Sequence, residues 1–494
     1  MNNGTLMQYF HFYYPNDGSL WKKVSGEAKN LAEMGITSLW LPPAYKAAGG
    51  NESVGYDVYD LYDLGEFNQK GSIPTRYGTK EEYLNAIKDA QAAGLLVYAD
   101  IVLNHMGGGD ETEQIIVKRV NPNDRNEMIG NEFEIKAFTK FLFYERKGKY
   151  SDFIWDSECF SGVDYADNLN ENSIFKIINS YGDTWEDGVD QENGNFDYLM
   201  YNDIEFRNVI VREELKKWGQ WYLETTHLDG FRLDAVKHID YRFYNEWLDI
   251  IRHNSKQELF TVGEYWALGN LEPLEKYIEK TSGRMSLFDV PLHMKFYEAS
   301  NAGKDFDLTK IFENTLVSAN PLLAVTVVEN HDTQPLQSLE SPVSAWFKPL
   351  AYAFILLRQN GYPCIFYPDY YGTTYTDKDY EGNDQEIIIN PVSGLKKMVE
   401  LRKNQAYGEQ GDYFEKPNLI GWVRRGDTDH KNSGCAVVIS NFEGGRINMQ
   451  IGKKFSERVF FDNLGSSVHE ITINGDGWGE FSAPPGGVSV WIPK

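Results

Sequence analysis

Residues 230–239, GFRLDAVKHI, decide how the fold of this chain is interpreted. The segment is typical of a buried β-strand, yet it carries Arg232 and Asp234 among apolar residues. In a strand, residues two apart point to the same side, so Arg232, Asp234 and Val236 are expected to share one face. An arginine and an aspartate side by side in a buried strand indicate a functional role.

Seven other short apolar runs accompany this segment, and helical patterns lie between most of them. The eight runs cover residues 6–14, 36–43, 95–105, 230–236, 259–266, 285–290, 324–332 and 362–369. Apolar residues at helical spacing predict helices over residues 81–94 and 211–226. Continuous apolar strands that alternate with helices predict an α/β fold, a (β/α)₈ TIM barrel. A doubly wound open sheet is the competing fold, but no strand is followed by a Gly-x-Gly-x-x-Gly turn.

The alternation of strands and helices is interrupted at two places, and each interruption predicts a further domain. About a hundred residues rich in Gly, Asn, Asp and aromatics follow the third strand, and a structureless loop of that length is improbable. Residues 105–208 are therefore expected to form a small β-rich domain, inserted after strand 3 of a barrel of residues 1–104 and 209–404. After residue 404, short β-rich runs alternate with Gly, Asp and Asn turns, which predicts a C-terminal antiparallel β-sandwich over residues 405–494.

Charge and composition narrow the possible partners. The 494 residues carry a formal net charge of −25, so neither nucleic acid nor an anionic membrane is an expected partner. No apolar run reaches the length of a membrane span, and the N-terminus lacks a secretory leader pattern. Three widely spaced cysteines fit free thiols in a reducing compartment. A cytoplasmic monomer is the expectation.

Three carboxylates, Asp234, Glu264 and Asp332, fall at predicted strand ends. A (β/α)₈ barrel gathers its chemistry at the C-terminal ends of the strands, so these residues should meet at one rim. Glycoside hydrolysis needs two carboxyl groups beside the sugar, one ionised and one protonated. The charge of Arg232 should favour the ionised form of Asp234, which suits a nucleophile, and apolar neighbours together with like charges should keep Glu264 neutral as an acid. Taken singly, each acid has an ordinary alternative as a helix cap or an ion-pair partner.

Three histidines and one acidic tract are candidate metal ligands. His105, His238 and His331 form no His-x-x-x-His pair and have no cysteine neighbours, so sugar binding or structural roles fit better than a transition metal. Asp197 and Asp203, together with Asn104, supply oxygen ligands that suit a hard cation such as calcium. An ordinary acidic loop is the alternative explanation in so acidic a chain.

Four segments occur in a characteristic order: DIVLNH at 100–105, GFRLDAVKH at 230–238, GEYW at 263–266 and ENHDT at 329–333. With them the chain resembles the α-amylases of glycoside hydrolase family 13 over nearly all of its length. The longer segments LPPAYK (41–46) and GNFDYLMYNDIEFRN (194–208) are similar to the liquefying bacterial branch. The resemblance implies endo-hydrolysis of α-1,4-glucosidic bonds in starch, glycogen and maltooligosaccharides, by a retaining mechanism.

The resemblance also implies a role for each residue at the expected rim. Asp234 would be the nucleophile, Glu264 the acid/base, and Asp332 a residue that holds sugar hydroxyls. The residues expected to bind substrate are Arg232, His105, His331, Tyr56, Lys237, His238 and Trp266. The expected ligands of one calcium are Asn104, Asp197, Asp203 and the carbonyl group of His238.

Two departures from the family pattern concern a second metal. Glu186 and Glu205 stand where secreted liquefying amylases have aspartates of a second metal cluster. A longer side chain alters the geometry around a cation, so only one calcium is expected.

Two other functions stay open at this point. An α-glucan transglycosylase of the same family would use the same covalent intermediate, with a sugar hydroxyl in place of water. A non-catalytic carbohydrate-binding protein would lack one of the three carboxylates, and all three are present.

Overall fold

The computed structural model describes residues 3–255 and 258–494, and its centre is a closed barrel of eight parallel strands. Around the barrel the order is β1–β2–β5–β12–β13–β14–β15–β16. Each strand lies inside one of the eight apolar runs, so the predicted TIM barrel is confirmed. The strands are β1 (Leu6–Gln8), β2 (Ser38–Leu41), β5 (Leu96–Ile101), β12 (Gly230–Leu233), β13 (Phe260–Gly263), β14 (Ser286–Phe288), β15 (Ala324–Val327) and β16 (Tyr362–Phe366).

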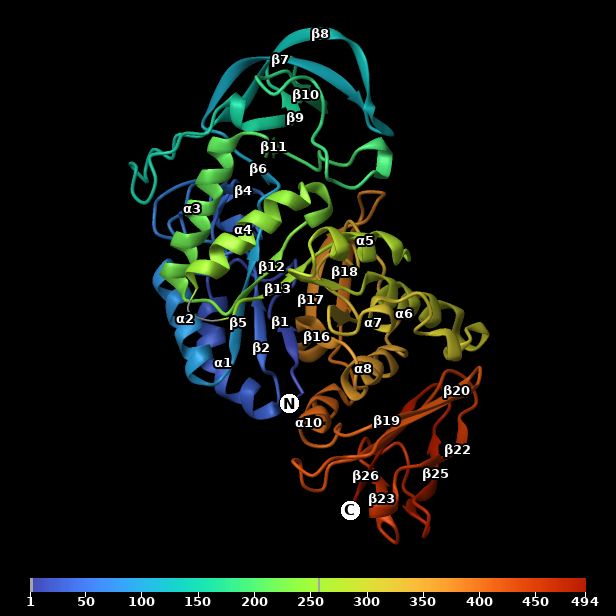
Figure 1. The fold of residues 1–494 in the computed structure, drawn as a ribbon. Helices are drawn as coiled ribbons and strands as arrows, with labels where there is room; N and C mark the ends of the chain where they lie inside the picture. Colours follow the sequence, from blue (N-terminus) through green and yellow to red (C-terminus); the bar gives the residue numbers. More distant parts are fainter. Residues whose placement is uncertain (1–2, 256–257) are drawn as a thin grey trace.

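Helices surround this barrel (Figure 1). The two helices predicted from apolar spacing are α2 (Lys80–Ala92) and α3 (Val209–Thr226). Thr79 and Glu82 form a capping box at the start of α2, which satisfies N–H groups that the first turn leaves free. The other helices are α1 (Leu20–Met34), α4 (Tyr241–Asn254), α5 (Glu272–Lys280), α6 (Val290–Ala302), α7 (Leu316–Ala319), α8 (Lys348–Leu357), α9 (Tyr367–Tyr371) and α10 (Leu395–Asn404).

The barrel strands are shorter than the apolar runs, mainly at their C-terminal ends. Strand β12 ends at Leu233, Ala235 has a left-handed backbone with φ of 48°, and Val236–His238 forms a 3₁₀ turn. The prediction that Val236 continues the face shared by Arg232 and Asp234 is therefore wrong. The rim residues belong to loops, where strand alternation no longer fixes the direction of a side chain.

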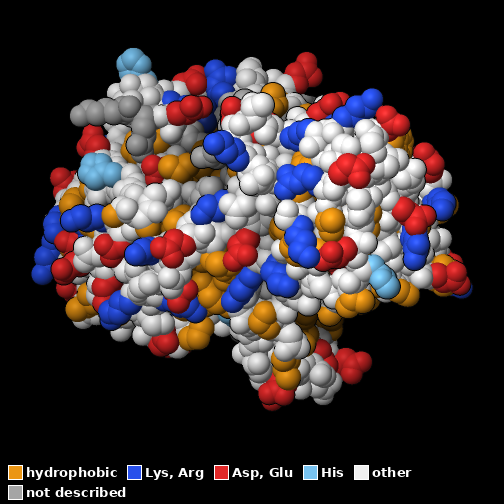
Figure 2. Space-filling model, turned by 90° about the horizontal axis from the view of Figure 1, so that it is seen from below, with side chains coloured by type: hydrophobic (Ala, Val, Ile, Leu, Met, Phe, Trp, Pro, Cys, Tyr) orange, Lys and Arg blue, Asp and Glu red, His pale blue; other side chains and the backbone are white. Residues whose placement is uncertain are grey.

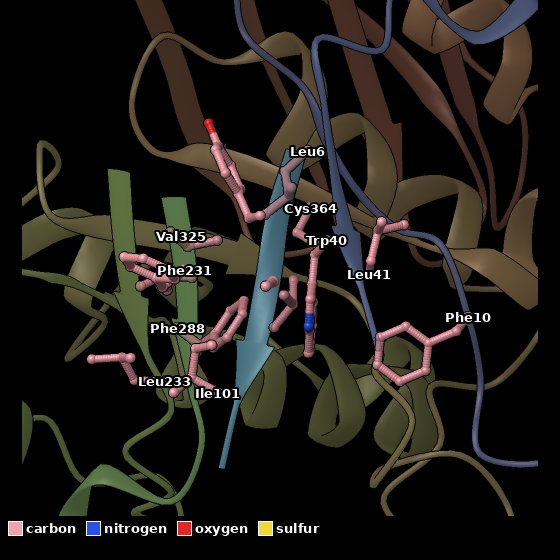
Figure 3. Packing of buried hydrophobic residues seen from close by; sticks show 14 of the residues in the cluster. Leu6, Phe10, Trp40, Leu41, Ile101, Phe231, Leu233, Phe288, Val325 and Cys364 are labelled. Atoms are coloured by element: carbon pink, nitrogen blue, oxygen red, sulfur yellow. The ribbon is translucent and has the colours of Figure 1, made fainter. Parts of the chain in front are cut away.

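The barrel interior is filled by buried side chains from different strands. Leu6, Trp40 and Val325 belong to one hydrophobic cluster, and Figure 3 shows them among other buried side chains of that cluster. Phe231 of β12 points outward, because its ring packs 5.4 Å from that of Trp247 on α4. Its neighbour in the strand must then point into the barrel, which places Arg232 in the interior.

The chain between β5 and α3 forms a six-stranded sheet, which agrees with the expected β-rich insertion. Its order is β6–β11–β9–β10–β7–β8, and its paired strands are antiparallel. Strand β6 follows β5 after three residues, so this sheet stands over the C-terminal ends of the barrel strands (Figure 1). The strands are β6 (His105–Met106), β7 (Glu111–Asn121), β8 (Asp124–Lys140), β9 (Phe160–Ala166), β10 (Glu171–Ile177) and β11 (Asn202–Ile204).

The residues after α10 form two antiparallel sheets at the opposite end of the molecule from the inserted sheet (Figure 1). A six-stranded sheet, β19–β20–β21–β26–β23–β24, and the pair β22–β25 share a core that includes Val438, Met449 and Trp491. This is the predicted β-sandwich. Its strands are β19 (Gln410–Lys416), β20 (Leu419–Arg424), β21 (Cys435–Ser440), β22 (Gly445–Gln450), β23 (Val459–Asp462), β24 (Glu470–Thr472), β25 (Trp478–Ala483) and β26 (Val488–Pro493).

Two short hairpins were not predicted. One pairs β3 (Lys46–Ala47) with β4 (Val58–Asp60), and the other pairs β17 (Thr373–Lys378) with β18 (Asp384–Ile389), after the last barrel strand. The second hairpin is attached to the barrel rim, because Tyr375 stacks on Tyr13 with ring centroids 3.9 Å apart. The limits expected for the three domains lie beside element ends, Asn404 of α10 and Val209 of α3, and stay predictions.

The surface of the molecule carries charges of both signs. Seen from below, acidic and basic side chains are interspersed, with hydrophobic side chains scattered among them (Figure 2). The three cysteines are buried free thiols. Across residues 3–255 and 258–494, the structure has no helix whose length and apolar character would carry it through a bilayer.

Candidate active site

Arg232 is the centre of the polar cluster at the barrel rim. Its Nη1 lies 2.6 Å from Asp234 Oδ1 and 2.8 Å from Asp100 Oδ1, and its Nη2 lies 2.8 Å from Glu264 Oε2. Asp100 is the register partner of Arg232 on β5, whereas Asp234 and Glu264 directly follow β12 and β13. One buried guanidinium therefore holds acids from three adjacent strands.

Asp100 had no role in the sequence-based prediction, although it anchors this arrangement. Its Oδ2 accepts the indole N–H of Trp40 at 3.0 Å and the hydroxyl of Tyr56 at 2.8 Å, in addition to the bond from Arg232 to Oδ1. Asp100 thus fixes both the arginine and the tyrosine. The available signal was its place near the end of the third run, but its role depends on β5 lying beside β12, which the sequence does not show.

Electrostatics at the rim confirm one expectation and contradict another. Burial raises the pKa of Asp234 to about 7, and Arg232 opposes this rise. The prediction that the charge of Arg232 favours the ionised form of this acid is therefore confirmed. Glu264 Oε2 accepts N–H groups from Arg232 and from Ala235 at 3.1 Å, so the predicted apolar surroundings of Glu264 are wrong. Burial and the charge of Glu264 raise the pKa of Asp332 well above its usual range.

Two histidines flank Tyr56 at the rim. The rings of Tyr56 and His331 are stacked, with centroids 4.9 Å apart and planes 10° from parallel. His331 Nε2 lies 3.3 Å from Asp332 Oδ2, and His105 Nε2 donates to the carbonyl group of Tyr56 at 2.8 Å. Burial lowers the pKa of His105 to about 4 and that of His331 well below its ordinary value, so both rings are neutral at pH 7.

Lys237, His238 and Trp266 lie to the side of the carboxylate cluster. Lys237 Nζ pairs with Glu192 Oε2 at 2.7 Å, and His238 Nδ1 donates to the carbonyl group of Phe196 at 2.7 Å. Both partners belong to the segment between β10 and β11, two strands of the inserted sheet. The ring of Trp266 packs 5.8 Å from a histidine ring of α6. Contact of these three residues with a substrate stays a prediction.

The candidate metal ligands lie in a buried cluster between β5 and β11. Asn104 Nδ2 donates to Asp203 Oδ1 at 3.2 Å, while Asn104 Oδ1 is buried and has no hydrogen-bond partner within the described residues. Burial and neighbouring carboxylates raise the pKa of Asp203 well above its usual range and that of Asp197 to about 7. An orphaned oxygen beside two acids that resist ionisation fits a hard cation. In the part of the chain that is described, no three His, Cys, Asp or Glu side chains form a metal-binding group, so a calcium here needs the oxygen of Asn104 as well as a backbone carbonyl.

Glu186 and Glu205 lie beside these residues and are bound by protein donors. Glu205 accepts two side-chain N–H bonds of 2.6 Å from Arg207, and Glu186 accepts the backbone N–H groups of Phe206 and Arg207. Lys176 is also buried here, and its ammonium group interacts with Glu205. Protein cations therefore compensate charge on this side of the cluster.

Comparison with known proteins agrees with this arrangement over the full chain. Residues 18–398 match the family model "Alpha amylase, catalytic domain", and residues 436–492 match "Alpha-amylase C-terminal". The alpha-amylase of Geobacillus stearothermophilus is 51% identical over 492 residues, which cover 100% of this chain and 87% of the relative. The cytoplasmic alpha-amylase of Escherichia coli K12 is 47% identical over 493 residues, which cover 100% and 99%.

A solved structure shares the fold. The alpha-amylase of Geobacillus thermoleovorans, complexed with acarbose, matches with a TM-score of 0.64 at 19% identity, covering 100% of this chain and 98% of that one. Together, the barrel, the carboxylate cluster at its rim, the two family models and the full-length relatives show that this chain belongs to the α-amylase family.

Proposed function

We propose that this chain is an endo-acting α-amylase, which hydrolyses internal α-1,4-glucosidic bonds of starch, glycogen and maltooligosaccharides with retention of configuration. The carrying observation is that one guanidinium holds Asp234 and Glu264 at the ends of adjacent strands. Leu233 and Gly263, which precede them, are register partners, and paired strands lie about 4.8 Å apart. Retaining glycosidases separate their two carboxyl groups by about 5 Å.

The proposed reaction has two steps. Asp234 attacks the anomeric carbon while Glu264 gives its proton to the glycosidic oxygen, so the glucosidic bond breaks and a glucosyl ester forms on Asp234. Glu264, now ionised, takes a proton from water as the water oxygen attacks the same carbon and releases Asp234. Arg232 stays paired with both acids and holds them in place, and its charge favours the ionised form of Asp234.

The remaining rim residues are proposed to hold the sugar. Asp332 accepts hydroxyl hydrogens, and the neutral ring of His331 donates an N–H bond to a hydroxyl oxygen. The single N–H of His105 is already bound to the carbonyl group of Tyr56, so Nδ1 of this ring accepts a hydroxyl hydrogen. The ring of Tyr56, fixed by Asp100, offers an apolar face to the sugar ring. The side chains proposed for the leaving-group side are Lys237 and His238, and Trp266 is proposed as a further substrate-binding residue.

A paired time course on soluble starch tests the endo-hydrolase directly. Iodine staining is expected to collapse while few reducing ends have appeared, because internal cuts shorten long chains quickly. Glu264→Gln, which cannot donate the proton, is expected to be silent in both assays. A change in staining with no new reducing ends would instead identify a transglycosylase. Equal inertness of wild type and variant would support the non-catalytic alternative.

We also propose one calcium, held by Asn104, Asp197, Asp203 and the carbonyl group of His238. When bound, it would neutralise buried carboxylates and tie β11 to the end of β5. The orphaned oxygen of Asn104 and the raised pKa values of the two aspartates support this site. Arg207 and Lys176 already compensate the charge of the neighbouring Glu205, which supports a single calcium.

Chelation is expected to lower the thermal midpoint of the wild-type protein, because ligand binding to the folded state adds stability. Asp203→Asn should have a lower midpoint from the start and respond little to the chelator. Glu171→Gln, which alters a half-exposed pair with Arg119 in the same domain, should respond as wild type does. Metal analysis of the purified protein that finds no calcium, together with an unchanged midpoint after chelation, would rule out the site.

We propose that the enzyme acts as a monomer in the cytoplasm on an α-glucan, without nucleic-acid or membrane partners. The printed name of the Escherichia coli relative supports the location. The net charge of −25 supports the absence of polyanionic partners.

A further inference from the structure

We propose that a buried ion network of Glu329, Lys348 and Asp369 positions His331 and Asp332 for the reaction. Glu329 follows β15 and precedes the two rim residues, whereas Lys348 begins α8 and Asp369 lies in α9. The inference rests on the proposed function, because it assigns positioning residues to that same site. None of the three touches the carboxylates held by Arg232, so their effect must act through the loop that Glu329 begins.

The network joins three elements by short, buried contacts. Lys348 Nζ lies 2.8 Å from Glu329 Oε2 and 2.6 Å from Asp369 Oδ1. The hydroxyl of Tyr352 donates to Asp369 Oδ2 at 2.6 Å. Glu329 is 2% exposed, Lys348 7% and Asp369 0%, so water does not compete for these bonds. The three contacts fix the position of the Glu329 carboxylate relative to α8 and α9.

Glu329 connects this fixed point to both ends of the rim loop. Its backbone leads through Asn330 to His331 and Asp332, and its Oε1 accepts the N–H of Val343 at 2.6 Å. The start and the end of residues 330–342 are thus held by one side chain. Asn330 Oδ1 in turn accepts the N–H of Asp332 at 2.9 Å, which shapes the turn between them. A displacement of the Glu329 carboxylate would therefore be passed to the imidazole and the carboxylate that face the sugar.

An ion network at this position is better suited to fixing the position of the rim loop than to stabilising the folded protein. A buried ion pair often contributes no more to folding than apolar residues of similar volume, because both charges must be desolvated. The pair does, however, accept only a narrow range of geometries. Burial and Asp369 raise the pKa of Glu329 to about 7, and Lys348 opposes this rise, so the contact with Lys348 favours the ionised carboxylate. Misplacement of a reacting group by about 1 Å can cost on the order of 100-fold in rate, so such precision matters at this rim.

The test compares four variants with the wild-type enzyme on a defined maltooligosaccharide. Glu329→Gln keeps the shape and the acceptor for Val343 but loses the charge that Lys348 binds. We expect kcat to fall about 10- to 100-fold, with KM changed far less, because sugar contacts away from the cleaved bond persist. Glu329→Asp, which keeps the charge, should recover part of kcat.

Asp289→Asn is the matched control. Asp289 is an equally buried acid that follows β14, and it accepts N–H groups of Leu292, Leu316 and Val317, outside the rim loop. This variant should lose thermal stability and keep its kcat.

A lower thermal midpoint of Glu329→Gln with an unchanged kcat would overturn the inference, because a purely structural network predicts that result. If Glu329→Gln does not fold, Glu329→Asp and Lys348→Arg provide the test instead. Both substitutions keep the charge but change the position of the charged group. A wild-type kcat in both variants would overturn the proposal. A wild-type protein without hydrolytic activity would contradict the proposed function instead, so the two failures are distinguishable.

Discussion

Asp234→Asn is expected to reduce kcat on α-glucans by at least about 10⁴-fold, comparable to the loss of a nucleophile in other covalent mechanisms. The amide has the shape of the carboxylate but cannot form the glucosyl ester. The variant should bind substrate, since Asp332, His331 and Tyr56 are unchanged. The measurement is the rate at which new reducing ends form, in wild type and variant, at equal concentrations of folded protein.

The same variant is expected to be at least as stable as the wild-type protein above neutral pH. Burial raises the pKa of Asp234 in the folded state to about 7, above its value in the unfolded chain. The folded state therefore binds this proton more tightly, and the ionised carboxylate costs stability as pH rises through about 7. Replacing it with a neutral amide removes that cost while Arg232 keeps Asp100 and Glu264 as partners. A thermal midpoint at pH 8 that equals or exceeds that of the wild type would show that the ionised nucleophile lowers the stability of the folded enzyme.

A second variant separates the nucleophile from other roles. In Glu264→Gln, a glucosyl fluoride should still react with Asp234, because fluoride leaves without a proton, and breakdown of the ester should be slow. Mass spectrometry should then find one added glucosyl group on the peptide that contains Asp234. A label on another residue, or an Asp234→Asn protein of near-normal kcat, would contradict the assignment.

The barrel could be predicted because its signal is repeated and local. Each strand is covered on both faces and therefore has a continuous apolar sequence, and the helices between the strands have apolar residues at helical spacing. Arg232 was conspicuous for the same reason, because a charge inside such a run needs an explanation. The ends of the strands were harder to predict. Apolar side chains continue past Leu233 and Val327 into loops that are also buried. Composition alone therefore does not show where the hydrogen bonding between neighbouring strands ends.

The surroundings of the site could not be predicted, because they depend on which strands are neighbours. Asp100 faces Arg232 across the β5–β12 pairing, and these residues lie 132 positions apart in the sequence. The expected apolar shell of Glu264 was inferred from Tyr265 and Trp266, its neighbours along the chain. The structure turns those side chains elsewhere, toward Asp190 and α6, and gives Glu264 two N–H donors instead.

Arg232→Met is expected to have the largest effect on stability, a loss of about 3–5 kcal/mol, the range found when one partner of a buried ion pair is removed. Arg232 is fully buried and pairs with Asp100, Asp234 and Glu264. Without the guanidinium, three acids would share a buried site with no cation in contact, so they would bind protons or the barrel would open. Chemical denaturation monitored by circular dichroism, at several pH values, measures this loss.

The pH dependence gives this prediction its sharpest form. In the variant, loss of the positive charge raises the folded-state pKa of Asp100 and Asp234 further, so the folded protein gains stability as pH falls and these acids take up protons. The difference in stability between the variant and the wild type should therefore be largest near pH 8 and should shrink toward pH 5.

Two further variants test the role of the arginine. Arg232→Met combined with Asp100→Asn should recover part of the lost stability, because one buried charge is gone. Arg232→Lys should fold better than Arg232→Met and remain inactive, since one ammonium cannot reproduce the planar fork that aligns Asp234 with Glu264. A variant Arg232→Met as stable as the wild type at pH 8 would mean that the acids do not depend on this arginine, and the proposed geometry of the nucleophile would fail with it.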